Sequence, residues 1–262
     1  YNYYSSEADA EACINEKTTK FTDVQTIYVK ITGKGNYEGT VIKSYQIQPY
    51  SFTTAADDKV ELSYTNSVVY TRSPVTTKSA SLNVTGLNVT FSTNKNGSLT
   101  SGDYEITFAS DKSGETQIDV PTNVGTYYIV INGKGNFTGK RTFAFTITEK
   151  SLADDDILVE FEKVWFDREE HKLLPSVKFK NLEVETNCYT VQYYSSETDA
   201  KAGTNEKTTG FTDAQTIYVK ITATENGNYK LSRVVSYEIQ KATITSVALE
   251  SVSTNYNTKV QK

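Results

Sequence analysis

The stretch GTYYIVINGKGNFTG, residues 125–139, decides the fold because it reads as most of one β-hairpin. Its first half alternates Tyr127, Ile129 and Ile131 with residues that tolerate water, which is the period-two pattern of a strand with one buried face. The Gly and Asn residues of NGKGN accept the positive φ angles that a tight hairpin turn needs. The sequence therefore predicts two paired strands that close a β-sheet domain.

Related phrases occur twice more, so the hairpin belongs to a repeated unit. QTIYVKITGKGNYEGT begins at Gln25, and QTIYVKITATENGNYKLS begins at Gln215. Residues 3–32 recur almost unchanged and without a gap as residues 193–222. An aromatic residue follows the turn in each copy, at spacings of 100 and 92 residues: Tyr37, Phe137 and Tyr229. A period of this length is typical of domains with their own cores.

Each copy closes on a strand, and boundaries drawn after these strands divide the chain into four segments. We predict the C-terminal part of a truncated repeat, two complete repeats and the N-terminal part of a further repeat: residues 1–48, 49–149, 150–240 and 241–262. The two partial segments together are shorter than one repeat. We therefore expect either a parent protein that continues beyond both ends or termini that are partly unfolded.

Composition and charge narrow the class of protein. Thr, Ser, Asn, Val, Ile and Tyr dominate, which is typical of β-sheet proteins. The formal net charge of −5 argues against binding to nucleic acid, which needs a dense basic surface. No stretch approaches the ~20 apolar residues that span a bilayer, so we expect no membrane insertion within this segment. The two cysteines, Cys13 and Cys188, lie in different copies, and we expect no disulfide between them.

The residues just before the hairpin point to a particular sheet architecture. NVGTYYI, residues 123–129, has the layout of the tyrosine corner of immunoglobulin-type sandwiches, with Tyr127 as the corner tyrosine. The other two copies place Ile27 and Ile217 at that position. Strand signals every 8–12 residues support an all-β fold of tandem immunoglobulin-like β-sandwich repeats. In SSETDAKAGTNEKT, residues 195–208, a helical turn is tolerable, but the Gly, Asn and Thr content favours a loop.

These phrases resemble the tandem immunoglobulin-like repeats of bacterial cell-surface proteins, especially those of gut Firmicutes. The resemblance is carried by YYSS…FTDAQTIYVKIT and SGDYEITF…NVGTYYIVINGKGNFTG, and it covers residues 50–240 and both partial segments. Such repeats commonly form non-catalytic stalks behind leucine-rich-repeat, adhesive or glycan-degrading modules. The resemblance thus implies an extracellular, cell-surface or cell-wall location and no enzymatic activity, and it assigns no ligand-binding residue.

The sequence contains few residues of the kinds that catalytic sites use. His171, in DREEHKLLP, is the only histidine. Its neighbours Glu169 and Glu170 are consecutive, and consecutive side chains of an extended chain point to opposite faces. A Ser-His-acid set or a phosphate-binding loop is not recognisable. We expect no catalytic residue and a solvated loop around His171.

The stretch ADDDI, residues 153–157, is the better candidate for a metal site than His171 with Glu169 and Glu170. Asp154, Asp155 and Asp156 offer oxygen ligands of the kind that Ca²⁺ prefers, next to a repeat boundary. The alternative is an ordinary acidic surface, because no acidic run occupies this place in the other copies. We expect no cofactor other than this possible Ca²⁺.

Aromatic residues supply the candidates for ligand binding. Trp165 is suited to stack on a sugar ring, but its alternation with Phe161 favours a core strand. Tyr28, Tyr128 and Tyr218 recur at one strand position and offer a sticky stripe, or else pack across strands.

Together these patterns favour a non-catalytic stalk or spacer with a possible adhesive role. The alternatives are a module that binds carbohydrates or host proteins, and an accessory domain of a glycan-degrading enzyme. The partners expected in the adhesive cases are glycans or proteins of a host or of the cell surface.

Overall fold

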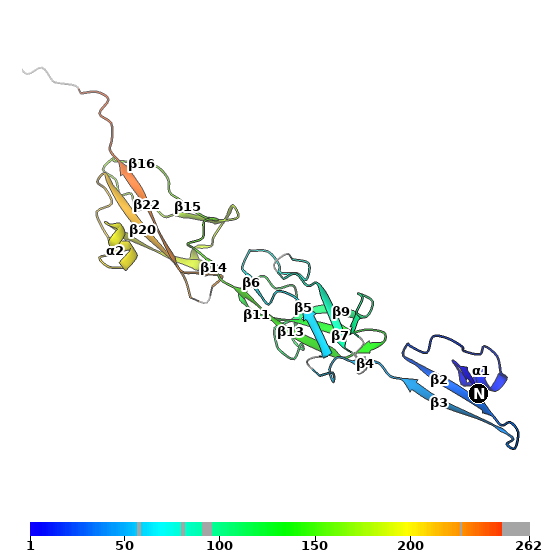
Figure 1. The fold of residues 1–262 in the computed structure, drawn as a ribbon. Coiled ribbons are helices and arrows are strands. Elements are labelled where there is room, and N and C mark those ends of the chain that lie inside the picture. The colour runs from blue at the N-terminus through cyan, green and yellow to red at the C-terminus, as the bar shows by residue number, and fades with distance from the viewer. Residues whose placement is uncertain (57–58, 80–81, 91–95, 226, 248–262) are drawn as a thin grey trace, which may run out of the picture. The chain divides into compact units, whose positions relative to one another are not determined.

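The computed structural model describes residues 1–56, 59–79, 82–90, 96–225 and 227–247 and is drawn in Figure 1. The fold is rich in β-strands and has few helices. The chain divides into two compact units, Tyr1–Lys150 and Ser151–Lys262. In the described residues, no helix combines the length and the apolar character needed to cross a membrane. Most of the segment predicted as the start of a further repeat, residues 248–262, lies outside the described residues.

The first part of the Tyr1–Lys150 unit is a three-stranded antiparallel sheet in the order β1-β2-β3. Its elements are β1 (Asn2–Tyr4), α1 (Glu7–Ala12), β2 (Gln25–Thr32) and β3 (Thr40–Ile47). In the register of β2 and β3, Ile27 lies opposite Tyr45 and Ile31 opposite Val41. Directly opposed residues share a face, so these four side chains form one apolar face, called here the β2–β3 face.

The second part of this unit contains two sheets and a short strand pair. The larger sheet has the order β10-β9-β11-β13-β6, the smaller one β5-β7-β8, and β4 pairs with β12. The strands are β4 (Tyr50–Ser51), β5 (Val60–Ser63), β6 (Ser67–Val69), β7 (Gly86–Thr90), β8 (Asn96–Ser98), β9 (Tyr104–Ala109), β10 (Gln117–Ile118), β11 (Gly125–Gly133), β12 (Phe137–Thr138) and β13 (Lys140–Thr148). The predicted hairpin is confirmed, since β11 and β13 pair from Gly125–Ile147 to Asn132–Lys140.

The Ser151–Lys262 unit repeats this plan, beginning with a short strand that straddles the unit boundary. Its sheets have the orders β15-β17-β18 and β16-β22-β20-β19, and β14 pairs with β21. The elements are β14 (Lys150–Ser151), β15 (Ile157–Glu160), β16 (Val164–Trp165), β17 (Ser176–Phe179), β18 (Leu182–Glu183), the 3₁₀ turn η2 (Thr186–Cys188), β19 (Tyr189–Tyr194), α2 (Glu197–Ala202), β20 (Gln215–Ala223), β21 (Tyr229–Lys230) and β22 (Ser232–Gln240).

Both sheets of this unit contribute to its apolar core. Ile217 and Ile221 of β20 and Val177 and Phe179 of β17 are at most 2% exposed. Leu152, which directly follows β14, is buried with them. One face of β20 is therefore buried, as the alternation of its residues predicted. Leu152 and strand β17 contribute buried side chains to the same core.

A short helix, α2, occurs in residues 195–208, where the sequence favoured a loop, so that expectation was wrong, and α1 forms in the equivalent segment of the first copy. In α2, the Ser196 side chain accepts a hydrogen bond from the Asp199 backbone N–H at 3.1 Å. Gly203 adopts φ +70° and ends the helix. Ser–x–x–Asp is an N-cap pattern and Gly suits a left-handed C-cap. Gly203, Thr204 and Asn205, which argued for a loop, therefore lie at or beyond the end of the helix.

The tyrosine-corner hydrogen bond predicted at residues 123–129 is confirmed. The Tyr127 hydroxyl donates to the backbone carbonyl of Asn123 at 3.0 Å. In the other two copies a glutamine holds the corresponding loop instead. The Gln25 side-chain amide donates to the carbonyls of Lys20 and Asp23, and Gln215 donates to those of Gly210 and Asp213.

Candidate functional site

Two hollows of the Ser151–Lys262 unit lie beside a break between two strands. β15 ends at Glu160 in one sheet, and β16 begins at Val164 in the other. The three residues between them leave one sheet and join the other, so their side chains cannot follow a single strand alternation. Phe161 and Glu162, in this crossing, line hollows on either side of it.

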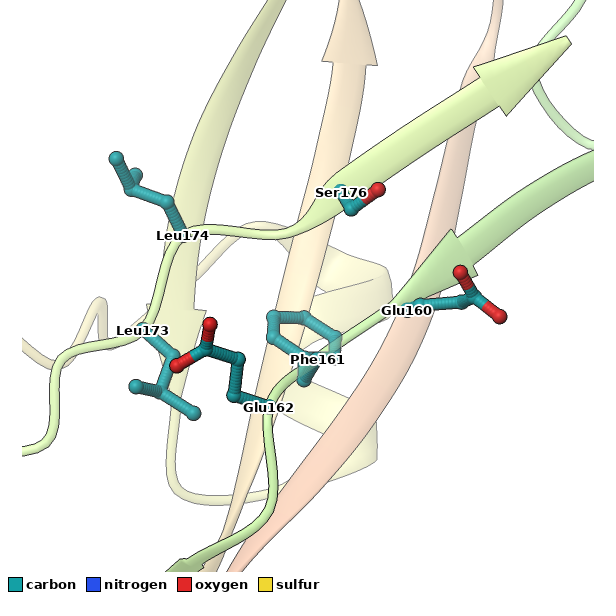
Figure 2. Close-up of a pocket in the computed structure, with 6 residues that line it drawn as sticks. All are labelled: Glu160, Phe161, Glu162, Leu173, Leu174 and Ser176. Carbon is teal, nitrogen blue, oxygen red and sulfur yellow. The ribbon is translucent and has the colours of Figure 1, made fainter. Parts of the chain in front are cut away.

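The first hollow has a volume of about 460 Å³. Figure 2 shows Phe161 and Glu162 on the chain that leaves β15, and Leu173 and Leu174 on the segment that leads into β17. Glu160 and Ser176, which pair in the strand register, complete the lining. The surface therefore combines apolar side chains with carboxylates.

The second hollow is smaller, about 230 Å³, and lies along the last strand. Its lining residues come from the crossing and from β22: Val159, Phe161, Glu162, Lys163, Ser236, Tyr237, Glu238 and Gln240. The Phe161 ring packs on Tyr237 with ring centroids 4.9 Å apart. One face of this ring is thus occupied, and its position is fixed by the core.

The carboxylates of the first hollow differ in their environments. Glu160 accepts a hydrogen bond of 2.9 Å from the Lys178 ammonium. This bond and the charge of Glu160 raise the pKa of Lys178 above its ordinary value. Within the described part of the chain, Glu162 makes no ion pair. Glu162 is therefore the available acceptor for the hydroxyl groups of a sugar or for a cationic side chain.

His171 is held in place by interactions that do not form a catalytic set. Its Nε2 lies 2.8 Å from Asp167 Oδ1, and its backbone N–H donates to the carbonyl of Phe211. The Glu169 backbone N–H and His171 lower the pKa of Asp167. Among the described residues, no hydrogen bond joins His171 to a Ser, Thr or Cys side chain, so a nucleophile–base pair is not formed there.

The acidic candidates Asp154, Asp155 and Asp156 lie in the turn between β14 and β15. Arg233 donates to the backbone carbonyls of Asp154 and Ile157, at 3.4 and 2.7 Å. The described residues contain no group of three or more His, Cys, Asp or Glu side chains placed to hold a metal ion. The turn is thus organised by an arginine that binds its backbone.

Trp165 lies on the surface, so the favoured interpretation as a core-strand residue was wrong. It is 52% exposed and pairs with Gln240 at the parallel edge of β16 and β22. The strand break at residues 161–163 explains the error, because Trp165 and Phe161 do not belong to one continuous strand. Trp165 lines neither hollow described above.

The three stripe tyrosines are half-buried and lie in three different sheets. Each has small or aromatic neighbours in register. Tyr28 lies opposite Tyr4, Tyr128 opposite Ala109, and Tyr218 opposite Tyr194. Cross-strand packing accounts for these contacts.

The sequence interpretation missed Phe161, Glu162 and Leu174 as site residues. The signal that pointed to them was the charged Lys163 on the apolar side of the alternation, because it marks the position where the strand breaks. Leu174 carries no signal in the sequence, since a leucine in a polar loop resembles any other surface leucine. It is 77% exposed.

The two cysteines differ in environment. Cys13 ends α1 in the left-handed conformation with φ 56°, is exposed, and lies 2.9 Å from the Lys30 ammonium. Cys188 ends η2 and is half-buried. No disulfide joins these two residues in the structure.

Comparison with known proteins places one part of this chain in context. None of the curated proteins matches it. A model of a protein family does match residues 174–245. This region begins shortly before β17, contains α2, β20 and β22, and includes Leu174 but not Phe161. It indicates a bacterial domain of extracellular type. Over residues 174–245 the chain is similar to the family described as the Flavobacterium inter-domain disulphide bond domain.

Proposed function

We propose that the chain is a non-catalytic spacer segment of a bacterial cell-surface or secreted protein, built from tandem immunoglobulin-like repeats. The strand order supports the immunoglobulin-like assignment. The second part of the Tyr1–Lys150 unit and the Ser151–Lys262 unit each contain two main sheets. In each of them a short strand pairs in parallel with the last long strand: β6 with β13, and β16 with β22. The hydrogen bond from Tyr127 to Asn123 adds a corner of the immunoglobulin type.

The observation that carries the spacer proposal is the shortness of the connections between repeats. Only Gln48 and Pro49 separate β3 from β4, and only Glu149 separates β13 from β14. Both linker strands pair with the turn that precedes the last strand of the repeat they open, β4 with β12 and β14 with β21. Connections of one or two residues offer little of the freedom of a flexible linker.

A side-chain contact adds to this restriction within the Tyr1–Lys150 unit. The backbone N–H of Val24 donates to Asn136 Oδ1 at 2.7 Å, and Asn136 Nδ2 donates to Asp23 Oδ1 at 3.0 Å. Asn136 lies in the turn between β11 and β12, while Asp23 and Val24 precede β2. This pair of bonds, called here the Asn136 clasp, supports a connection of defined geometry.

Small-angle X-ray scattering of the 262-residue chain tests the proposal. A compact protein of this length has a radius of gyration of about 18 Å. A spacer of serial repeats is expected to give a clearly larger value and an elongated pair-distance distribution. A value near 18 Å would contradict it. The spacer proposal does not require bound calcium. We therefore expect the same scattering profile in the presence of Ca²⁺ and in the presence of a chelator.

The hollows around Phe161 favour a second candidate function, the binding of a carbohydrate or a host protein. A half-buried aromatic ring beside the carboxylate of Glu162 suits sugar hydroxyl groups or a basic side chain. Screening the protein on arrays of glycans, mucins and matrix proteins tests this function. A saturable ligand lost in Glu162→Gln and retained in Trp165→Ala would place binding in the hollows, and loss in Trp165→Ala would place it at the exposed tryptophan.

The third candidate, an accessory domain of a glycan-degrading enzyme, predicts catalytic residues in another module. Hydrolysis of a glycan by residues 1–262 alone would contradict the non-catalytic proposal. The extracellular location is part of the same proposal, and surface labelling of cells that express the natural protein tests it.

A further inference from the structure

The chain crosses between sheets at two equivalent places, which differ in what lies beside them. Three residues carry the chain from β5 in one sheet to β6 in another, and three carry it from β15 to β16. The first two residues of each crossing therefore correspond, Tyr64 with Phe161 and Thr65 with Glu162.

At the crossing from β5 to β6, the chain itself supplies a hydrogen-bond acceptor and an apolar side chain. The Thr65 backbone N–H donates to the Leu82 carbonyl at 2.8 Å, and Leu82 is fully buried. The Tyr64 hydroxyl donates to the Ala144 carbonyl at 2.7 Å. Leu82 belongs to the connection between β6 and β7, residues 70–85. This longer connection therefore satisfies the backbone of the crossing from within the repeat.

The crossing from β15 to β16 is more open, and the corresponding connection is shorter. Residues 166–175 alone join β16 to β17. Leu174 of this connection is 77% exposed, and Phe161 has no hydroxyl group to bond. Within the described part of the chain, neither the backbone N–H nor the carboxylate of Glu162 has a hydrogen-bond partner. The hollow of about 460 Å³ lies beside this crossing, with a free donor and a free acceptor on one residue.

The charge of the lining indicates which ligand would complement it. Figure 2 shows the Glu162 side chain on the same side as Leu173, whereas the Glu160 side chain points the other way. Glu160 is paired with the Lys178 ammonium at 2.9 Å, so Glu162 carries the uncompensated charge of this lining. Among the described residues, no lysine or arginine lines the hollow. A cationic side chain is therefore the complementary group.

The apolar part of the lining favours an alkyl chain over a sugar ring. A sugar ring stacks on an open aromatic face, but one face of the Phe161 ring is covered by Tyr237 at 4.9 Å. Trp165 does not line the hollow. Leu173 and Leu174 offer aliphatic surface instead. The stems of lysine and arginine pack on such surface while the charged head stays in water.

We propose that this hollow binds an arginine or lysine of a partner polypeptide, with the cationic head at the Glu162 carboxylate and the stem on Leu173 and Leu174. The head forms a charge-assisted hydrogen bond with the carboxylate. A backbone carbonyl of the partner accepts from the Glu162 N–H, in the role that the Leu82 carbonyl has at the other crossing. The proposal rests on the second candidate function, binding at the hollows, and is independent of the spacer function.

Selection from a phage-displayed library of random peptides on the full 262-residue chain tests the proposal. We expect the selected peptides to share an arginine or lysine next to an apolar residue. Fluorescence anisotropy with one such synthetic peptide should give a Kd at least about tenfold higher for Glu162→Gln, which removes the charge from the hydrogen bond. Glu185→Gln, at an exposed glutamate of the same unit that lines neither hollow, is the matched control and should leave the Kd unchanged.

A double-mutant cycle assigns the contact to the two charged groups. Replacing the basic residue of the peptide by glutamine should weaken binding to the wild type, and should weaken binding to Glu162→Gln little further. Leu174→Ser removes aliphatic surface from a side chain that is 77% exposed, so it should weaken binding without disturbing the core. Binding should also weaken as the salt concentration rises, because Glu162 is exposed to water.

Three results would each overturn the proposal: no enriched peptide, enriched peptides without a basic residue, or the same Kd for the wild type and Glu162→Gln. A glycan that binds the wild type but not Glu162→Gln, in the absence of a basic peptide ligand, would reject the basic partner and retain binding at the hollows. Failure of both peptides and glycans to bind would reject the partner and the second candidate function together.

Discussion

The Tyr237 hydroxyl donates a 2.7 Å hydrogen bond to the backbone carbonyl of His171 and accepts one from the Leu173 N–H at 3.3 Å. It ties β22 to the segment that covers it. Tyr237→Phe removes both bonds from a residue that is 6% exposed, so we expect a loss of about 1–2 kcal/mol in unfolding free energy. Urea unfolding followed by circular dichroism measures the loss, and the emission of Trp165 assigns it to the Ser151–Lys262 unit.

The equivalent tyrosine of the first sheet provides the control. Tyr45 is 46% exposed, and Tyr45→Phe is expected to change stability by less than about 0.5 kcal/mol. Equal losses of unfolding free energy in Tyr45→Phe and Tyr237→Phe would contradict a stabilising role for the bonds to His171 and Leu173.

Alkaline pH should destabilise the Ser151–Lys262 unit. Burial, with a contribution from Tyr237, raises the pKa of Tyr193 from 10.0 to about 12. Above pH 10 the unfolded chain loses this proton before the folded one, so stability falls between pH 10 and about 12. Urea midpoints measured across this range should decrease with pH. Tyr193→Phe should flatten the decrease, and an unchanged slope would contradict the assignment.

The Asn136 clasp predicts a defined geometry within the Tyr1–Lys150 unit. Asn136→Ala removes the bonds to Asp23 and Val24, while both partners remain exposed to water, so stability should change little. The expected effect is a broader distance distribution between spin labels on Cys13 and on a cysteine introduced at Ser101, in a Cys188→Ser background. Asn36→Ala, at the equivalent turn position, should leave the distribution unchanged. Equal widths in all three proteins would argue against the clasp.

The C-caps of the two helices differ in a way that can be measured. Gly203 adopts φ +70°, which costs a side-chain-bearing residue about 1 kcal/mol. We expect Gly203→Ala to destabilise its unit by about that amount. Cys13 already occupies the same conformation with φ 56°, so Cys13→Gly should stabilise its unit by up to about 1 kcal/mol. Thermal unfolding of both variants against the wild type checks the opposite signs.

Thiol chemistry should distinguish the two cysteines. The segment 49–149 contains no cysteine, so it has no thiol with which to form a disulfide to Cys188. We expect two titratable thiols per chain without reductant, with exposed Cys13 reacting faster than half-buried Cys188. Cys13→Ser should leave only the slow phase. Fewer than two equivalents in the wild type would indicate a disulfide.

Local sequence predicted the parts of the fold that depend on short-range patterns. Alternation and turn residues predicted the pairing of β11 with β13, and the Asn-x-Gly-x-Tyr pattern predicted the bond from Tyr127 to Asn123. Two helices were missed because a Ser–x–x–Asp cap of one turn has less weight in a sequence than the Gly and Asn residues that follow it.

The candidate site depended on information that alternation does not contain. Trp165 was paired with Phe161 on the assumption of one continuous strand, but the chain changes sheets between them. The sequence also could not predict that Ile31 is exposed while Ile221 is buried, because both residues lie in the same phrase, QTIYVKIT. Burial there is decided by which other segment lies on the face.

The pairing of β14 with β21 has a consequence for biosynthesis. Lys150 and Ser151 leave the ribosome first, and their partners Tyr229 and Lys230 follow roughly 80 residues later. At about 5–20 residues per second, the opening strand waits about 4–16 s for its partner. During that interval Leu152 has no turn against which to pack. A nascent repeat therefore closes only when its final hairpin emerges, and a translational pause before Tyr229 would prolong the exposure of its apolar strands.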